Sequence, residues 1–459
     1  MNGASALAAR RRVRHPVRIA HLGLGAFHRA HQAWYTQLAN DLGGDWGIAA
    51  FTGRTAAAAA ALQAQDCVYT LLTRRPVEDT ATLVESISSA HDGADLPAWR
   101  AVLSDPDVVV LTMTVTEAGY RLNHAGDLDE ADPRVGADLE LLRRSGDRAP
   151  ETAIGRIVDG LRARRQAGAG PIAIVSCDNL PGNGEVTRRA VLAAATAVDR
   201  DLAGWIEASV SFVSTMVDRI TPAASDGDRL TVRELTGVAD SVPVVTEEFS
   251  EWVLSGEFPG GRPDWHLVGA RFVADVTPFE QRKLWFLNAA HSLLAYCGLD
   301  AGFSTVSQAF ADAGCRGLVE QLWDEARPLL DLPSGEMDEW LEQLRMRWSN
   351  PRIEHRLVQI GADGSQKLPL RILEVARRRR AAGLATGVAG AAAIAAWVRY
   401  LERGDGARYD PAATGLAAEL RGMTAAQQAT AAVAFLGPGD REDPGLIAAI
   451  TKRLEGALT

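Results

Sequence analysis

Cysteine is scarce in this sequence: the 459 residues include four, at positions 67, 177, 297 and 315. No two of them form a CxxC pair, and no closely spaced histidine is present that would complete a tetrahedral zinc site. We therefore expect a reduced, cytoplasmic protein that needs no metal.

The sequence also lacks a surplus of positive charge. The formal net charge is -10 and the pI is near 5.5, so few cations are available to displace counterions from nucleic-acid phosphates. No uninterrupted apolar run is long enough to cross a bilayer. We therefore expect a small-molecule partner, with no nucleic acid and no membrane. No heptad seam or extended edge strand indicates an interface, so the oligomeric state stays open.

The chain is long enough for two domains. Its first half alternates short β-branched strands with helical segments, which is the pattern of a doubly wound α/β domain. After about Val273 the periodicity is mainly helical. The sequence predicts a Rossmann-like, dinucleotide-binding domain over 1–275 and a mainly α-helical substrate domain over 276–459. The predicted strands are Val17–Leu22, Trp46–Phe51, Val108–Met113 and Ile172–Ser176.

A glycine turn follows the first of these strands. Gly23 and Gly25 match the first two glycines of the dinucleotide fingerprint, which let backbone N–H groups approach a pyrophosphate. The segment continues through Ala26 and Phe27 into a helix, and we expect all four residues to bind the cofactor. The third glycine of the fingerprint is replaced by His28, so an ordinary strand-to-helix turn is the alternative.

The acidic residue that usually binds the cofactor ribose is missing after the second strand. No carboxylate occurs between Asp45 and Asp66. Arg54 lies in this gap and is a candidate partner for a 2′-phosphate, although an exposed loop arginine is the alternative. The missing acid weakens the expected preference for NAD. NAD remains the predicted cofactor, and dual or NADP use is an open hypothesis.

The segment from Lys283 to His291 sets three polar residues into an apolar helical pattern. At 100° per residue, Asn288 lies about 140° and His291 about 80° around the helix from Lys283, so the three converge on one side. Apolar neighbours remove water from a charged lysine and lower its pKa toward that of a useful general base. The alternative is structural, with Lys283 reaching solvent and the other two making internal hydrogen bonds.

Six segments, in the same order, resemble motifs of the mannitol dehydrogenase family, the zinc-independent long-chain polyol and sugar-acid dehydrogenases. These motifs are spread over nearly the whole chain. They are Gly23–His31, Thr114–Tyr120, Ser176–Pro181, Met216–Ile220, Lys283–His291 and Asp363–Pro369. The resemblance implies a nucleotide-binding N-terminal domain, a helical C-terminal domain and an active site between them.

The resemblance also implies a role for each matching residue. Lys283 would be the catalytic base, and Asn179 and Asn288 would donate hydrogen bonds to the alkoxide-like oxygen. His291 would bind a substrate hydroxyl beside the reacting carbon. Asp218 and Lys367 would hold the rest of an open-chain substrate.

Several of these residues have structural alternatives. Asp218 could form only a salt bridge with Arg219, and Lys367 could be a surface residue. Asp178 could cap a turn. Glu117 is a candidate proton relay, and equally a buried carboxylate satisfied by the backbone. The segment from Asn350 to Arg356, with His355, resembles the family as well and is expected to border the substrate pocket.

The leading hypothesis is an oxidoreductase that transfers hydride between NAD(P) and a secondary alcohol of an open-chain polyol, of the mannitol and fructose type. Gly261–Trp265 resembles the branch that reduces fructuronate to mannonate, so fructuronate reductase is a close alternative. Mannitol 1-phosphate dehydrogenase is a third. A non-catalytic dinucleotide-binding sensor is the alternative from a different class.

Overall fold

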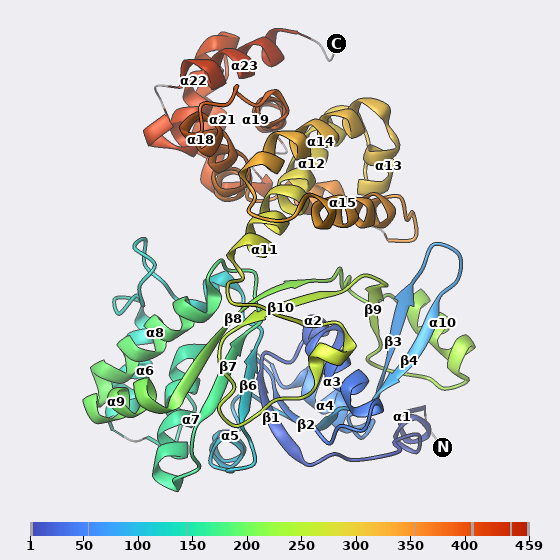
Figure 1. Ribbon diagram of the computed structural model, residues 1–459, viewed down its shortest axis with the longest axis vertical. Coiled ribbons are helices and arrows are strands. Elements are labelled where there is room, and N and C mark those ends of the chain that lie inside the picture. The colour runs from blue at the N-terminus through green and yellow to red at the C-terminus, as the bar shows by residue number, and fades with distance from the viewer. Residues whose placement is uncertain are drawn as a thin grey trace. The chain divides into compact units, whose positions relative to one another are not determined.

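The computed structural model describes residues 3–53, 55–144, 146–353, 355–404, 408–440 and 443–456. The chain divides into two compact units, Met1–Thr277 and Pro278–Thr459. Each unit has its own architecture, α/β in the first and helical in the second (Figure 1). Within the described residues, no helix is both long enough and apolar enough to cross a membrane.

The N-terminal unit is built on one eight-stranded sheet. Six of its strands are parallel to one another, and the edge pair β10 and β11, parallel to each other, runs antiparallel to them. The spatial order is β11 (Arg271–Phe272), β10 (Glu251–Ser255), β8 (Val210–Asp218), β7 (Ile172–Ser176), β6 (Val110–Met113), β1 (Val17–Leu22), β2 (Gly47–Phe51) and β5 (Ile87–His91). The strand order reverses between β6 and β1, which is where open α/β sheets bind ligands.

Alternate residues of these strands face two separate hydrophobic cores. Ala20 and Leu22 of β1 pack on one face with helices α5 to α9, whereas Ile19 packs on the other face with α3 and the smaller sheet. Because successive strand side chains point to opposite faces, a strand buried on both sides is apolar throughout. The prediction of a doubly wound Rossmann-like domain followed by a helical domain is confirmed.

Helices flank the main sheet, and a second sheet adds three strands. The helices are α1 (Gly3–Ala8), α2 (Ala26–Ala30), α3 (Gln32–Asp41), α4 (Ala57–Gln63), α5 (Leu96–Leu103), α6 (Pro133–Arg143), α7 (Ala153–Ala167), α8 (Asn183–Val198), α9 (Arg200–Ser209) and α10 (Asp226–Thr236), with 3₁₀ turns η1 (Glu117–Tyr120) and η2 (Trp265–Val268). The smaller sheet has the order β4 (Thr80–Val84), β3 (Tyr69–Arg74) and β9 (Val244–Glu247).

The C-terminal unit is helical throughout its described residues. Two segments, η3 and η5, are π-helical, and they pack against each other. The elements are α11 (Thr277–Arg282), which spans the unit boundary, η3 (Lys283–Asn288), α12 (Ala289–Asp300), α13 (Val306–Ala311), α14 (Ala313–Ala326), η4 (Arg327–Leu329), α15 (Ser334–Trp348), α16 (Leu357–Ile360), α17 (Gly364–Leu368), η5 (Pro369–Leu373), α18 (Glu374–Ala381), α19 (Val388–Glu402), η6 (Pro411–Ala413), α21 (Thr414–Glu419), α22 (Ala425–Leu436), η7 (Pro438–Asp440) and α23 (Pro444–Glu455).

A fully buried arginine, Arg164, binds the loops that precede β6 and β7 of the main sheet. Its guanidinium donates to six backbone carbonyls at 2.8–3.3 Å, in the loops that lead into β6 and β7. Burial lowers the pKa of Arg164 to about 10, which leaves it protonated at neutral pH. The charged group therefore satisfies carbonyl oxygens that would otherwise be buried without donors. The six acceptors are Leu103, Asp105, Val108, Ala169, Gly170 and Pro171.

We expect Arg164→Leu to lower the free energy of unfolding by at least about 3 kcal/mol, because several buried carbonyls would lose their donor. Urea unfolding followed by circular dichroism measures this. Arg165→Leu is the matched control on the same helix. Its ion pair with Asp199 spans 3.5 Å between half-exposed side chains, so its loss should cost less than about 1 kcal/mol. Equal losses would contradict the role of Arg164.

Candidate functional site

The glycine turn after β1 is held between two neighbouring strands. The N–H groups of Gly23 and Leu24 both donate to the Phe51 carbonyl of β2, and the Thr114 hydroxyl after β6 donates to the Gly23 carbonyl at 2.8 Å. Gly23 has a φ of +111°, and a Cβ there would overlap the Thr114 carbonyl. Only glycine therefore fits the first position of this turn.

His28 occupies the position of the missing third glycine. That glycine normally allows a helix to approach the sheet closely. Here the His28 ring lies flat against the ring of His21 in β1, with ring centroids 3.3 Å apart and both side chains fully buried. Burial lowers the pKa of His21 to about 3, and that of His28 well below its ordinary value, so both rings are neutral. The stacked rings of His21 and His28 thus let α2 pack closely on β1 without a glycine.

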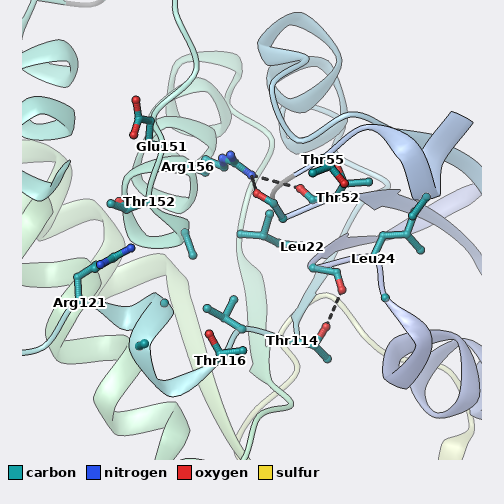
Figure 2. A pocket seen from close by; sticks show the side chains of 18 of the residues that line it. Leu22, Leu24, Thr52, Thr55, Thr114, Thr116, Arg121, Glu151, Thr152 and Arg156 are labelled. Atoms are coloured by element: carbon teal, nitrogen blue, oxygen red, sulfur yellow. Dashed lines mark hydrogen bonds between the residues drawn. The ribbon is translucent and has the colours of Figure 1, made fainter. Parts of the chain in front are cut away.

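A cavity of about 580 Å³ opens beside the glycine turn (Figure 2). It lies at the carboxyl ends of β1, β2 and β6, where the strand order reverses. The first residues of α7 form the opposite wall. Its lining includes Gly23, Gly25, Thr52, Gly53, Thr55, Thr114, Thr116, Arg121, Thr152 and Arg156.

The loop after β2 carries no carboxylate of its own. Its carbonyls, those of Thr52 and Gly53, accept hydrogen bonds from Arg156 of α7 at 3.2 and 3.1 Å. Arg54, the predicted 2′-phosphate partner, lies outside the described residues. Ala26 and Phe27 begin α2 directly after the turn, as expected of a segment that presents N–H groups to a ligand.

Asn179 lies in the exposed bend that follows β7, at the same edge of the sheet. The carboxylate of its neighbour Asp178 is buried and accepts a hydrogen bond of 2.5 Å from the Tyr120 hydroxyl. Burial raises the pKa of Asp178 to about 7. Asp178 therefore ties the bend that carries Asn179 to Tyr120 of η1.

The remaining candidates of the N-terminal unit are Asp218 and Glu117. Asp218 ends β8 and is 5% exposed. Its neighbour Arg219 donates to the carbonyls of Ala30 and Glu247. Glu117 is exposed at the start of η1, so the alternative of a buried carboxylate is wrong.

Lys283 and Asn288 are the two ends of the π-helical segment η3. Lys283 is 9% exposed, and Asn288 is half-buried. A π-helical turn closes between residues five apart, so these two residues lie one turn apart on the same side of the helix. The separation of about 140° expected from regular α-helical geometry is therefore wrong here. Single π-helical turns occur frequently at functional sites.

His291 sits one turn further along, in α12, and is 7% exposed. The indole N–H of Trp348 donates to its Nε2 at 3.0 Å, and the ring of His355 lies edge-on at 5.0 Å. Burial, with the charges of Arg347 and Arg371 nearby, keeps the pKa of His291 well below its ordinary value. Because Nε2 accepts from Trp348, the neutral ring carries its proton on Nδ1 and is a hydrogen-bond donor there.

Lys367 lies in α17 and Arg371 in η5, the π-helical segment that packs against η3. Lys367 donates to the carbonyls of Ile360 and Ala362, at 3.3 and 2.6 Å, so it is not an unattached surface residue. Arg371, in the π-helical segment η5, donates to the Asn288 carbonyl and to the Ser292 hydroxyl. The structure therefore brings Lys283, Asn288, His291 and the Lys367 stretch together within the C-terminal unit.

Among the described residues, no three histidine, cysteine, aspartate or glutamate side chains are grouped so that they could hold a metal ion. All four cysteines are buried free thiols.

Two family models together match nearly the whole chain. The model of the mannitol dehydrogenase Rossmann domain matches residues 17–267, and that of the mannitol dehydrogenase C-terminal domain matches residues 275–457. The chain belongs to the mannitol dehydrogenase family. The resemblance inferred from six sequence motifs is thus confirmed.

Relatives within the mannitol dehydrogenase family differ in the activity that their names give. D-mannonate oxidoreductase of Escherichia coli is 40% identical over 84% of this chain and 80% of its own length. Mannitol 2-dehydrogenase of Cereibacter sphaeroides is 37% identical over 83% of this chain and 80% of its own. The solved ternary complex of Pseudomonas fluorescens mannitol 2-dehydrogenase with NAD and D-mannitol is 32% identical, with a TM-score of 0.81 over 96% of this chain and 92% of that one.

Two residues of this mannitol dehydrogenase family member, Arg156 and Trp348, were not predicted from the sequence. Arg156 lies about a hundred residues beyond the loop that it holds, and Trp348 lies 57 residues beyond the histidine to which it donates. Neither forms a motif with its partner. No pattern in the sequence links either residue to its partner, so only the three-dimensional structure identifies them.

We expect Gly23→Ala to weaken dinucleotide binding about tenfold or more, because a Cβ at positive φ strains the turn and pushes it from Thr114. Fluorescence titration with NADH and NADPH measures this. Gly204→Ala is the control, since a Cβ there meets open space in α9. It should bind both dinucleotides like the wild type, and unchanged binding in Gly23→Ala would contradict the assigned turn.

Proposed function

We propose that this protein is an NAD(P)-dependent oxidoreductase that interconverts a secondary alcohol of an open-chain polyol with the corresponding ketone. The two units would act as a dinucleotide-binding domain and a substrate domain. The observation that carries the proposal is Lys283, a buried lysine that shares one side of a π-helical turn with Asn288. Membership of the mannitol dehydrogenase family supports the same reaction class.

The N-terminal unit fits a dinucleotide. The turn at Gly23 leaves no room for a Cβ, and a cavity of about 580 Å³ lies beside it at the strand-order reversal. A complex with NAD is known for the Pseudomonas fluorescens relative. When bound, the nicotinamide supplies the acceptor or donor of hydride.

The residues of this chain would handle the proton and the substrate oxygen. A neutral Lys283 takes the hydroxyl proton as hydride leaves the same carbon, and the protonated lysine returns it in the reverse reaction. The amides of Asn179 and Asn288 donate to the developing alkoxide oxygen. No metal is required for this step.

Further residues would position the open-chain substrate. His291 donates from Nδ1 to a substrate hydroxyl, because Trp348 already occupies Nε2. Asp218 and Lys367 hold hydroxyls more distant from the reacting carbon. A substrate with many hydroxyls suits this set of donors and acceptors, since each buried polar group gains a partner.

A sugar acid is the second candidate substrate, of the mannonate and fructuronate type. Burial is the main cause of the lowered pKa of His291, and the positive charges of Arg347 and Arg371 nearby add to it. The same positive potential would favour a substrate carboxylate. The similarity to D-mannonate oxidoreductase supports this candidate as well.

The proposal is tested by assaying the purified protein with mannitol, arabinitol, mannonate and mannitol 1-phosphate, with either cofactor. Turnover of a polyol or a sugar acid is the expected result. Dinucleotide binding without turnover of any substrate would favour the sensor instead. Absence of both would refute the whole proposal.

We expect Lys283→Ala to lower kcat/KM about a hundredfold or more, since the general base is lost. Dinucleotide affinity should persist, because the glycine turn belongs to the other unit. Lys452→Ala is the matched control, as Lys452 is exposed on α23 and is one of only three lysines in the chain. Unchanged turnover in Lys283→Ala would remove it as the base.

We expect Trp348→Phe to lower kcat/KM about tenfold, because His291 would lose the hydrogen bond that fixes its donor tautomer. Steady-state kinetics below the unfolding temperature measure this. Trp265→Phe is the comparison, since it removes a buried indole hydrogen bond of 3.1 Å, to the Thr36 hydroxyl, within the N-terminal unit. A similar loss in both variants would indicate a packing effect only.

A further inference from the structure

The loop after β2 occupies a defined place in a Rossmann-like domain. At the carboxyl end of the second strand, an acidic residue usually accepts hydrogen bonds from the adenosine ribose, or an arginine accommodates a 2′-phosphate. Thr52 directly follows β2 here, and both Thr52 and Gly53 line the cavity beside the glycine turn. The side chains around these two residues therefore decide which adenosine ribose the cavity accepts.

Arg156 is fixed at this loop by three hydrogen bonds. Its Nη1 donates to the carbonyls of Thr52 and Gly53, and its Nε donates to the Pro150 carbonyl at 2.9 Å (Figure 2). A Cβ at Gly93 would lie 2.5 Å from Nη1, so the glycine leaves room for this arrangement. A guanidinium has five N–H donors. No described residue accepts from Nη2, which leaves both of its donors for a ligand.

The charge of Arg156 has no direct counter-ion among the described residues. Its three acceptors are neutral carbonyls, and no described carboxylate lies within ion-pair distance. The nearest acids, Asp138, Asp92 and Glu151, act on it only at longer range, and burial lowers its pKa. A half-buried cation that is held rigidly and has no described counter-ion is suited to bind an anion.

A second donor lines the cavity beside the same loop. Thr55 is exposed and follows the β2 loop, near the carbonyl oxygens that Arg156 holds (Figure 2). Glu151 is the one carboxylate among the described residues that line the cavity, against three arginines at positions 121, 134 and 156. At the β2 loop the cavity thus presents the cationic Arg156, where a ribose-binding acid would place a negative charge.

We propose that Arg156, with the hydroxyl of Thr55, forms a subsite for the 2′-phosphate of NADP, so that the protein prefers NADP over NAD. Nη2 of Arg156 donates to the phosphate while Nη1 and Nε keep the guanidinium in place. This inference rests on the proposed function, since it assigns a dinucleotide to the cavity.

The test compares 2′,5′-ADP with 5′-AMP as calorimetric ligands of the full-length protein, beside kcat/KM for NADP and NAD. The wild type should bind 2′,5′-ADP about tenfold more tightly or better, as a charge-assisted contact to phosphate requires. Arg156→Gln should remove this advantage and leave 5′-AMP affinity within about twofold. Thr55→Val, which does not disturb the Arg156 hydrogen bonds, should reduce it in part.

Arg121→Gln is the matched control, because it removes an equal charge from the same cavity away from the β2 loop. It should change the affinity for both ligands by similar factors. Equal affinity of the wild type for 2′,5′-ADP and 5′-AMP, or equal loss of both in Arg156→Gln, would overturn the subsite. In either case turnover with NAD would leave the oxidoreductase proposal standing, whereas failure to bind any adenine nucleotide would refute both.

Discussion

The close approach of the glycine turn to the end of β6 is the constraint on which the N-terminal unit depends. The Gly23 N–H donates a hydrogen bond to the Phe51 carbonyl, and the Gly23 carbonyl accepts one from the Thr114 hydroxyl. A Cβ at Gly23 would have no space. This contact joins the ends of three strands at the point where their order reverses. The cavity, the loop after β2 and the start of α7 are all placed relative to that junction, because each is tied to one of the same three strands.

A second recurring feature is an arginine, buried or half-buried, that donates hydrogen bonds to backbone carbonyls. Arg164 joins the loops below the sheet, Arg156 holds the loop above it, and Arg371 connects two π-helical segments of the C-terminal unit. The planar guanidinium suits this task because its several donors are fixed in one fork. Of 48 lysines and arginines only three are lysines. Arginine cannot lose its proton in a protein, so a lysine at position 283 agrees with a role that requires deprotonation.

The sequence predicted elements best where a local pattern determines them. Val17–Leu22 and Ile172–Ser176 were located to the residue, because continuous apolar strands of a parallel sheet are bounded by turn residues. The smaller sheet was not predicted, since its strands pair across long stretches of chain. The candidate residues of the Lys283 segment were found, but their angular relation was wrong. A π-helical turn depends on packing against η5, and no propensity in the segment indicates it.

The sequence by itself determined the fold class, the glycine turn and the family, because these follow from periodicity and from motifs whose residues are neighbours in the chain. The tertiary structure decided what surrounds each residue. It placed His28 flat against His21, gave His291 its donor tautomer through Trp348, and brought Arg156 to the loop after β2. Each of these rests on contact between residues of different elements, and such contacts form only when the elements pack.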